Sequence, residues 1–307
     1  MISVIIVNWN AGAQLAACIA SIDHHASGMN VHVVVVDNGS SDHSADFLRR
    51  RSDITLISTG CNQGFGKACN LGAAQATGDY LLFLNPDAAL YPHTLSRVLA
   101  YMQDPAQARV GICGVQLKDG LGHVARSCAR FPAPWALVAH ALGLVRLIPR
   151  WGHFMAEWAH DQTREVDHVI GAFYLVRRSL FEQIGGFDER FFVYLEDLDF
   201  SYRARQAGWR SVYLADAQAF HAGGGTSNQI KARRLFYSLR SRLLYAFKHF
   251  TLPGAWVVLL STLLLEPVAR SGHGLLRGSW ATLAETWSGY AMLFLWLPQW
   301  VLKGVTR

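Results

Sequence analysis

The chain has 307 residues and a formal net charge of +6, with 51% hydrophobic and 16% charged residues. This composition excludes a disordered or fibrous protein, because such chains are poor in apolar residues or strictly repetitive. The charge is uneven, since residues 1–227 carry a net charge of −2 and residues 228–307 a net charge of +8. We therefore expect two domains, residues 1–227 and residues 228–307.

The first part of the chain alternates between short apolar runs and helical patterns. Strands are predicted at 2–7, 31–36, 54–58 and 79–84, and helices at 12–26, from Ser41 or Asp42 to about 51, and at 65–77. This alternation predicts an α/β fold with a mostly parallel sheet and helices on both faces. In such a sheet, ligands bind at the carboxyl ends of the strands.

The middle of the chain is less regular. Residues 123–165 lack a clear period and contain three prolines, so we expect loops and short helices around an acceptor site. Order returns with a predicted strand at 168–176 and a helix from Ser179 to the Gly185-Gly186 pair. A helix at 196–207 and a strand at 211–214 complete this region.

Several signatures are missing from the sequence. No GxxxxGK[ST] motif is present, and Gly64-Phe-Gly66 lacks the third glycine of a dinucleotide fingerprint. Five cysteines occur without a CxxC pair, which argues against a zinc finger or a disulfide framework. The first ten residues lack the basic flank and long apolar core of a signal peptide, which favours a cytoplasmic location.

Polar residues follow each of the first four predicted strands. They are Asn8 and Asn10, Asp37 and Asn38, Asn62, and finally Asn85 and Asp87. Each alone is an ordinary turn residue. The carboxyl ends of parallel strands, however, meet at one edge of a sheet, where a row of donors and acceptors can bind a base and ribose and hold a metal ion.

These positions lie in stretches that resemble family 2 glycosyltransferases. The matching stretches are SVIIVNWN, VVVVDNGSSD, NQGFGKACNLG, LLFLNPD, GGFDERFFVYLEDLDFSYRARQAGW and FHAGGGTS, within residues 2–227. The resemblance implies the GT-A fold, a Rossmann-like, mostly parallel sheet flanked by helices. Within the family, the sequences of these motifs most resemble those of bacterial rhamnosyltransferases that use dTDP-rhamnose and build cell-surface polysaccharide.

The resemblance also implies the nucleotide-sugar contacts. They are Asn8, Asn10, Asp37, Asn38, Asn62, Gly66, Asn70, Asn85 and Asp87. The residue after the second strand, Asp37, corresponds to the acidic residue that binds the pyrimidine base, because a carboxylate can accept the imide N–H of uracil or thymine. A helix N-cap is the other interpretation of Asp37, and the two are compatible.

A divalent cation, Mg²⁺ or Mn²⁺, is implied at the family's Asp-x-Asp motif. Here the motif is Asn85-Pro86-Asp87, which has one carboxylate fewer, so Asp87 is the expected ligand together with the diphosphate of the donor. A histidine in the position of His221 completes the metal site in related enzymes. The glycines after His221 would allow the backbone to approach the diphosphate.

The acidic cluster Glu196-Asp197-Leu198-Asp199 is expected to supply the catalytic base. Inverting transfer needs a group that takes the proton of the acceptor hydroxyl. The resemblance assigns this role to Asp197, with Glu196 as the other catalytic carboxylate. Carboxylates at a helix N-terminus also stabilise the helix dipole, and we expect Asp199 to serve that purpose. Arg203 and Arg205 are expected to be structural or exposed, with contact of one of them to phosphate as the alternative.

The C-terminal region is predicted to be helical and to associate with a membrane. Residues 251–265 and 286–302 contain no charge, and each is short for a bilayer core of about 30 Å. Pro253, Pro267 and Pro298 bracket these runs, which favours interfacial or re-entrant helices over full spans. Basic residues precede the first run and are expected to meet anionic lipid or a lipid diphosphate. They are Lys231, Arg233, Arg234, Arg240, Arg242 and Lys248. Nucleic acid, the alternative partner of a basic tail, is disfavoured by the interleaved apolar runs.

The sequence thus predicts an inverting, metal-dependent glycosyltransferase at the cytoplasmic face of the inner membrane, peripheral or monotopic. Its expected donor is dTDP-rhamnose, and its expected acceptor is a polyprenyl-diphosphate-linked or other cell-envelope glycan. Two alternatives stay open: a UDP-hexose donor in the same fold, and a non-catalytic protein that binds nucleotide sugars. The second is favoured only by Asn85 in place of a carboxylate.

Overall fold

The computed structural model describes residues 1–223 and 230–306, which form two compact units. The first, here called the sheet unit, comprises Met1–Arg130, Trp158–Glu189 and Glu196–Thr226. The second, the helical unit, comprises Phe131–Glu157, Arg190–Leu195 and Ser227–Arg307. The sequence-based division at 227/228 lies beside the last of these junctions. It assigned residues 131–157 and 190–195 to the first domain, whereas the structure places both in the helical unit.

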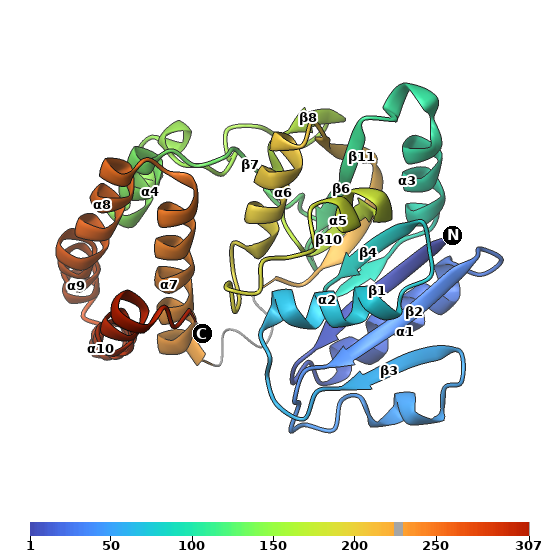
Figure 1. Cartoon of the computed structure of the whole chain (residues 1–307), viewed down its shortest axis with the longest axis horizontal. Coiled ribbons are helices and arrows are strands. Elements are labelled where there is room, and N and C mark those ends of the chain that lie inside the picture. The colour runs from blue at the N-terminus through green and yellow to red at the C-terminus, as the bar shows by residue number, and fades with distance from the viewer. Residues whose placement is uncertain (224–229, 307) are drawn as a thin grey trace. The chain divides into compact units, whose positions relative to one another are not determined.

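A mixed sheet forms the centre of the sheet unit (Figure 1). Its strands in the described residues are ordered β3-β2-β1-β4-β10-β6-β11-β5, with β8 paired to β11. The bounds are β1 Ile2–Asn8, β2 Val31–Asp37, β3 Ile54–Ser58, β4 Tyr80–Leu84, β5 Ala88–Leu90, β6 Val110–Lys118, β8 Arg164–Val166, β10 Phe173–Arg177 and β11 Arg210–His221. Strands β10, β5 and β8 pair antiparallel with their neighbours, and the other pairs are parallel. The mostly parallel sheet predicted from the sequence is therefore confirmed. A separate pair joins β7, Cys128–Ala129, to β9, His168–Val169.

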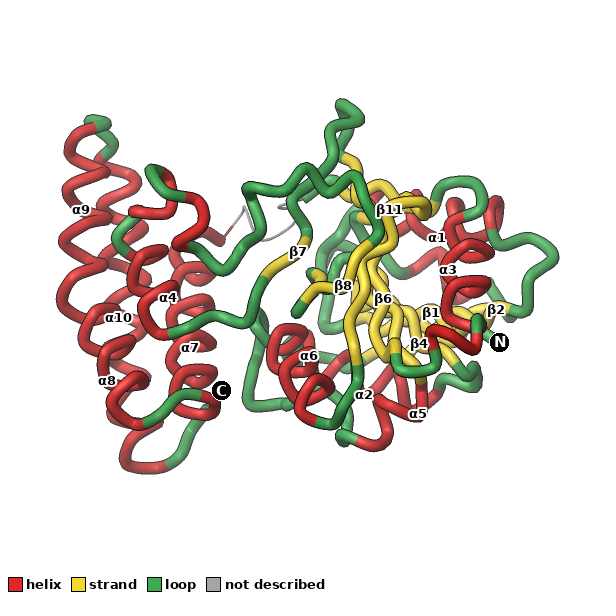
Figure 2. Tube along the Cα trace, turned by 90° about the horizontal axis from the view of Figure 1, so that it is seen from above, coloured by secondary structure: helices red, strands yellow, loops and turns green. Residues whose placement is uncertain are grey.

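Helices cover both faces of this sheet, as predicted (Figure 2). On one side lie α1, Ala13–His25, and α3, Thr94–Gln103. On the other lie α2, Phe65–Gln75, α5, Arg178–Gln183, and α6, Glu196–Gln206. Strand β1 is buried along its whole length, because a strand covered on both faces has no side chain that reaches water.

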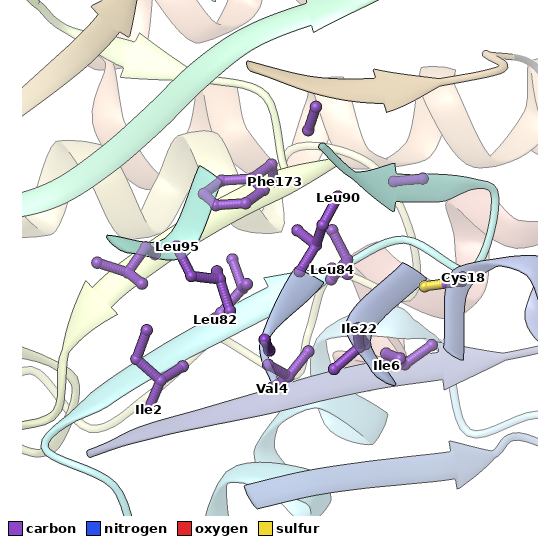
Figure 3. Close-up of a cluster of buried hydrophobic side chains, with 14 of the residues drawn as sticks. Ile2, Val4, Ile6, Cys18, Ile22, Leu82, Leu84, Leu90, Leu95 and Phe173 are labelled. Atoms are coloured by element: carbon purple, nitrogen blue, oxygen red, sulfur yellow. The ribbon is translucent and has the colours of Figure 1, made fainter. Parts of the chain in front are cut away.

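A hydrophobic core of the sheet unit fills the space between the sheet and helices α1 and α3 (Figure 3). Alternate residues of β1, such as Ile2, Val4 and Ile6, point into it and meet Ile22 of α1. The intervening residues of β1 face α2, where Gly72 lies so close that an added Cβ would come within 2.5 Å of Ile5 Cγ2. Burial on both faces fixes the register of β1 and hence the place where it ends.

Helices alone build most of the helical unit. They are α4 Pro134–Ala141, α7 Lys231–His249, α8 Leu252–Leu260, α9 Glu266–Leu276 and α10 Trp280–Lys303. Helix α10 packs on α7 and α9, and α8 packs on α4 and α7. A π-helical segment, Ser261–Leu265, joins α8 and α9 into one helix, Leu252–Leu276.

Two details of the predicted apolar helices are wrong. Pro267 and Pro298 do not end helices, since Pro267 lies at the start of α9 within the continuous helix and Pro298 lies inside α10. The wider π-helical turn directly before Pro267 accommodates a ring that would clash in a regular helix. Within the described residues, Leu252–Leu276 is the helix that is long and apolar enough to cross a membrane, with a mean hydropathy of 1.6.

Local polar contacts explain two further differences from the predicted elements. The helix expected to start at Ser41 or Asp42 is a short 3₁₀ helix, Asp46–Arg50. Asp42 instead accepts hydrogen bonds from Ser44 and from the backbone N–H of Gly12, which holds a turn in place of a helix start. The strand predicted at 168–176 is interrupted between β9 and β10, where the backbone N–H of Gly171 donates to Asp197.

Candidate active site

Asn8, Asp37 and Ser58 lie side by side at the carboxyl ends of β1, β2 and β3, because the three parallel strands pair in that register. Asn8 is fully buried, and its Nδ2 lies 3.1 Å from Asp37 Oδ1, 3.0 Å from Ser40 Oγ and 2.9 Å from Ser44 Oγ. Asp37 is half-buried. The Asn8 amide thus orients the Asp37 carboxylate at the edge of the sheet.

Asn10 contacts the turn after β2 through both its side chain and its backbone. Its Oδ1 accepts from the backbone N–H of Ser41 at 2.7 Å, and its own N–H donates to Ser40 Oγ at 3.0 Å. Asn10 has φ 51°, a left-handed conformation that asparagine tolerates better than most residues. These contacts fasten the turn after β1 to the turn after β2.

Asn38 and Asn62 build the next loop. Asn38 is buried, and its Nδ2 donates to Asn62 Oδ1 at 3.1 Å and to the carbonyl of Gly64 at 3.3 Å. Its Oδ1 accepts the backbone N–H of Gln63 at 2.8 Å. The half-buried Asn62 also accepts the N–H of Gly64. Both amides therefore shape the loop that leads into α2.

Gly66 and Asn70 lie on α2. Gly66 is buried in the first turn of the helix. Asn70 bonds in both directions with the backbone of Phe187, through Nδ2 to its carbonyl and through Oδ1 to its N–H, each at 2.9 Å. Gly186 packs against the same Oδ1, so Asn70 joins α2 to the turn after α5. In this structure Asn70 serves to position backbone.

Asp87 and His221 meet at the end of the sheet. Strand β5 pairs antiparallel with β11 so that His221 lies beside Ala88, and His221 Nε2 lies 3.4 Å from Asp87 Oδ1. The carbonyl of Asp87 accepts the N–H of Ala222 at 3.1 Å. Burial, and secondarily the charge of Asp87, raises the pKa of the Cys18 thiol, which keeps this neighbour protonated.

The Asp87–His221 pair fits a divalent cation as part of a shared coordination sphere. A carboxylate oxygen and an imidazole nitrogen are ligands that Mn²⁺ accepts, and the oxygens of a diphosphate suit both Mn²⁺ and Mg²⁺. Within the described residues, no group of three or more His, Cys, Asp or Glu side chains is arranged to hold a metal. The predicted glycines Gly224 and Gly225 lie outside the described residues.

Asp197 is the second residue of helix α6. Its Oδ2 accepts the backbone N–H of Gly171 at 2.8 Å, and its Oδ1 accepts that of Leu198 at 2.8 Å. The adjacent Ala172 carbonyl accepts the N–H of Asn85 at 3.0 Å. Asp197 is therefore connected through two successive residues to the Asn85-Pro86-Asp87 turn, which the sequence alone did not indicate.

Glu196 differs from its neighbour. It is buried, and its Oε2 has no hydrogen-bond partner among the described residues. Burial, together with the nearby charge of Asp197, raises the pKa of Glu196 well above its ordinary value. The raised pKa of Glu196 favours its protonated form beside Asp197.

The arginines after this cluster are structural, as expected. Arg203 binds Asp199 through Nε at 2.8 Å and donates to the carbonyls of Ile184 and Gly186. Arg205 lies on the surface and pairs with Glu165 at 2.6 Å. Asp199 thus forms an ion pair with Arg203, which lies one helical turn further along α6. This contact adds to any effect of Asp199 on the helix dipole.

A buried polar group behind Asp197 was missed by the sequence analysis. His168 Nε2 lies 3.6 Å from Asp197 Oδ2, and His168 Nδ1 lies 3.0 Å from Ser201 Oγ. Ser201 in turn lies 2.7 Å from the hydroxyl of Tyr174. The signal available in the sequence was the spacing of Asp197 and Ser201, which places both on one face of α6.

Comparisons with known proteins identify the family of this chain. Residues 3–185 match the Glycosyl transferase family 2 profile, so the chain belongs to this family and is a glycosyltransferase. It is 30% identical over 91% of its length to the N-acetylglucosaminyl-diphospho-decaprenol L-rhamnosyltransferase of Mycobacterium tuberculosis, covering 94% of that protein. It is 28% identical over 72% of its length to the rhamnosyltransferase WbbL of Escherichia coli, covering 84% of it.

Solved glycosyltransferase structures share the fold. The mannosyltransferase PcManGT from Pyrobaculum calidifontis, in complex with GDP-Man and Mn²⁺, has a TM-score of 0.56 and 20% identity, covering 99% of this chain and 83% of that one. S. aureus TarS 1-349 in complex with UDP-GlcNAc has a TM-score of 0.56 and 18% identity, covering 94% and 79%. Together with the sheet order, these likenesses establish the GT-A architecture predicted from the sequence.

Proposed function

We propose that the chain is an inverting rhamnosyltransferase that transfers L-rhamnose from dTDP-rhamnose to a lipid-linked glycan. The observation that carries this proposal is the connection of the Asp197 carboxylate to the Asn85-Pro86-Asp87 turn through the backbone of Gly171 and Ala172. That connection brings the candidate base to the strand ends at which the donor is expected. The rhamnose assignment is supported by the names of the two relatives.

The donor nucleotide is assigned to the loops after β1, β2 and β3. Asp37 accepts the imide N–H of thymine, and Asn62, Asn10 and Gly66 line the base, ribose and diphosphate path. Asn8, Asn38 and Asn70 are engaged with protein groups and contribute by fixing these loops. Asn85 contacts the ribose or the sugar.

Asp87 and His221 would hold Mg²⁺ or Mn²⁺ together with the diphosphate. A divalent cation there supplies positive charge that stabilises the departing nucleoside diphosphate. The facing pair of oxygen and nitrogen donors in Asp87 and His221 supports this assignment.

Asp197 receives the proton of the acceptor hydroxyl. The acceptor oxygen forms a bond to the anomeric carbon while the bond from that carbon to the diphosphate oxygen breaks, and its electron pair leaves with the nucleoside diphosphate. In the transition state, between the acceptor oxygen and the departing diphosphate oxygen, the anomeric carbon acquires oxocarbenium character. In-line attack inverts the configuration, so a β-linked dTDP-L-rhamnose yields an α-L-rhamnoside.

A donor panel tests the reaction. The purified protein is offered radiolabelled dTDP-rhamnose, UDP-glucose, UDP-galactose and UDP-N-acetylglucosamine, with Mn²⁺ or Mg²⁺ and a membrane lipid extract. We expect label from dTDP-rhamnose alone to enter the lipid fraction and Asp197→Asn to abolish the transfer while donor binding persists. Transfer from a UDP-sugar would replace the donor assignment. Binding of a nucleotide sugar without turnover under any condition would favour the non-catalytic alternative.

We further propose that the helical unit attaches the enzyme to the cytoplasmic face of the membrane and that helix Leu252–Leu276 lies in the membrane plane. Its exposed apolar residues recur every four positions, which makes one continuous stripe. They are Leu252, Trp256, Leu260, Leu264 and Val268, which are 49% to 70% exposed. The net charge of +8 on residues 228–307 complements anionic lipid.

The opposite face of this helix supports an in-plane orientation. Glu266 is fully buried and pairs with Arg242 of α7 at 2.6 Å and with Arg270 at 2.8 Å. A charged triad near the middle of a bilayer is costly, and α7 is too basic to accompany the helix into lipid. Arg242 and Arg240 are buried, so they do not meet lipid as the sequence analysis expected.

Flotation with vesicles tests this attachment. We expect binding to vesicles rich in anionic lipid, weakened by the double variant Leu264→Gln, Val268→Gln. The control Leu121→Gln removes an exposed leucine from the sheet unit and should bind as before. In a Cys61→Ser background, a cysteine placed by Arg277→Cys should react with an impermeant maleimide outside the vesicles; the exposed Cys61 of the original protein is the expected positive control. Protection of that cysteine would indicate a membrane-spanning helix instead.

A further inference from the structure

We propose that His168 is a positioning residue for the catalytic base, holding the Asp197 carboxylate in its orientation from the protein interior. The inference rests on the proposed role of Asp197 and adds a residue that no sequence motif indicated. It starts from the closed ring of contacts that joins β9, β10 and α6 behind the Asp197 carboxylate.

The ring has four members. His168 faces Asp197 Oδ2 through Nε2 at 3.6 Å and Ser201 Oγ through Nδ1 at 3.0 Å. The Tyr174 hydroxyl lies 2.7 Å from Ser201 Oγ and 3.3 Å from the backbone carbonyl of Asp197, and its proton points between these two acceptors. Three of the members, His168, Tyr174 and Ser201, are buried, so bulk water does not compete for their hydrogen bonds.

The partners of His168 determine which ring nitrogen carries the proton. Burial lowers the pKa of His168, although the charges of Asp197 and Asp167 oppose this effect, so the ring is neutral at pH 7. A neutral imidazole has one N–H, and the Asp197 carboxylate can only accept. The favourable arrangement therefore places the proton on Nε2, toward Asp197, while Nδ1 accepts the hydroxyl proton of Ser201.

This arrangement gives Asp197 Oδ2 two donors on the inner side. The backbone N–H of Gly171 is at 2.8 Å, and the His168 Nε2–H is at a distance that a small movement of the carboxylate converts to a hydrogen bond. Catalytic hydrogen bonds are often long in a ligand-free state and shorten in the complex. Donors to a carboxylate favour its charged form and fix its plane, and both effects serve a group that must accept a proton.

Other charged and titratable groups surround this pair. They are Glu196 and Asp199 on α6, Asp167 beside β9, Arg203 on α6, and Cys69 on α2. An ionised carboxylate can only accept hydrogen bonds, so ionised acidic neighbours cannot donate to Asp197, and a neutral N–H donor among them has a definite purpose. His168 supplies such a donor without introducing a second positive charge.

Three variants test the role of His168. His168→Leu removes the donor, His168→Gln places an amide N–H near the former Nε2, and Ser201→Ala removes the group that fixes the ring proton. We expect His168→Leu to lower kcat by about tenfold or more, the size of one lost hydrogen bond to a charged group, with the KM for the donor nearly unchanged. His168→Gln should recover much of this loss, and Ser201→Ala should lie between the two.

The pH profile separates positioning from a general structural effect. A carboxylate that loses a hydrogen-bond donor is protonated more easily, so the acid limb of kcat/KM should move to higher pH in His168→Leu and return toward its original place in His168→Gln. The matched control is His160→Gln, which alters another fully buried histidine of the sheet unit. It should change the melting temperature without moving the acid limb.

Two results would overturn the inference. One is an acid limb in His168→Leu that coincides with the original after correction for the folded fraction measured by circular dichroism. The other is a His168→Gln variant that loses as much kcat as His168→Leu while both remain folded. A failure of the proposed function is distinguishable, because an Asp197→Asn enzyme that keeps its turnover removes the base assignment whatever His168 does.

Discussion

The carboxylate of Asp87 and the imidazole of His221 face each other at the end of the sheet, with 3.4 Å between Oδ1 and Nε2. They come from distant parts of the chain and meet because β5 and β11 pair antiparallel at Ala88 and His221. The short strand β5, which was not expected from the sequence, therefore brings the two proposed metal ligands together.

Removal of either member of this pair should weaken metal dependence in a measurable way. We expect Asp87→Asn and His221→Ala each to raise the Mn²⁺ concentration needed for half-maximal transfer by at least about tenfold, since even supporting partners of metal ligands have effects of that size. Chelation with EDTA should abolish transfer by the unmodified enzyme. Asp46→Asn, which alters an exposed carboxylate on the 3₁₀ helix, is the control and should keep the original Mn²⁺ requirement. If the unmodified enzyme and the three variants all need the same Mn²⁺ concentration for half-maximal transfer, Asp87 and His221 are not metal ligands.

The buried Glu196 predicts a stability that depends on pH. Its pKa is raised in the folded protein, so the folded state binds a proton that the unfolded state releases above its ordinary value of 4.5. The contribution of Glu196 is therefore most favourable below that pH and is lost as pH rises, by at most about 1.4 kcal/mol per pH unit. Glu196→Gln removes this dependence, and its melting temperature relative to the original protein should increase from pH 5 to pH 8, as differential scanning fluorimetry can measure. A constant difference over this range would mean that Glu196 is ionised in the fold.

Gly39 should not tolerate a side chain. It has φ +75°, and an added Cβ would lie 2.6 Å from the backbone carbon of Cys61, so the loops after β2 and β3 would have to separate. We expect Gly39→Ala to lower the free energy of unfolding by roughly 2 kcal/mol or more and to weaken nucleotide binding. Gly60→Ala is the matched control, because Gly60 has φ +74° but no atom within 4 Å of the added Cβ. If both variants lose the same stability in urea titrations, backbone strain alone accounts for the effect.

The buried ion pair of the helical unit should be costly to break. Glu266→Gln leaves Arg242 buried without its charged partner, so we expect a loss of about 3 kcal/mol or more in the free energy of unfolding, measured by urea denaturation. Glu285→Gln removes a carboxylate from a more exposed pair with Lys231 at 3.6 Å, and its loss should stay below about 1 kcal/mol. Similar losses in the two variants would contradict the buried character of the Glu266 triad.

The sequence was sufficient for the order of the first elements and for the residues at the strand ends. Apolar runs such as residues 2–7 are recognisable because a strand covered on both faces has no polar positions. The sequence also predicted correctly that Asn8 and Asp37 lie close together. Parallel strands that end in register bring their last residues side by side. The family motifs added the fold and the enzyme class, and the comparisons confirm both.

Other features depended on contacts between distant residues. The direction of β10, the short β5 and the interruption at Gly171 follow from pairing partners that no local pattern encodes. Burial likewise separated residues that look alike in the sequence, because Arg240 and Arg242 are enclosed while Lys231 is exposed. The same holds for Glu196 and Asp197, which are adjacent in the chain but face different surroundings.

The sequence by itself determined that this chain is a family 2 glycosyltransferase with a basic, apolar C-terminal region. Hydrophobic periodicity, charge and motif sequence are local properties that can be read along the chain. Only the tertiary structure decided which polar groups face one another. Whether a carboxylate is ionised, a histidine neutral or an arginine enclosed depends on burial and on neighbours brought from elsewhere in the chain. His168 behind Asp197 is the clearest case, since its role is visible only once β9 lies against α6.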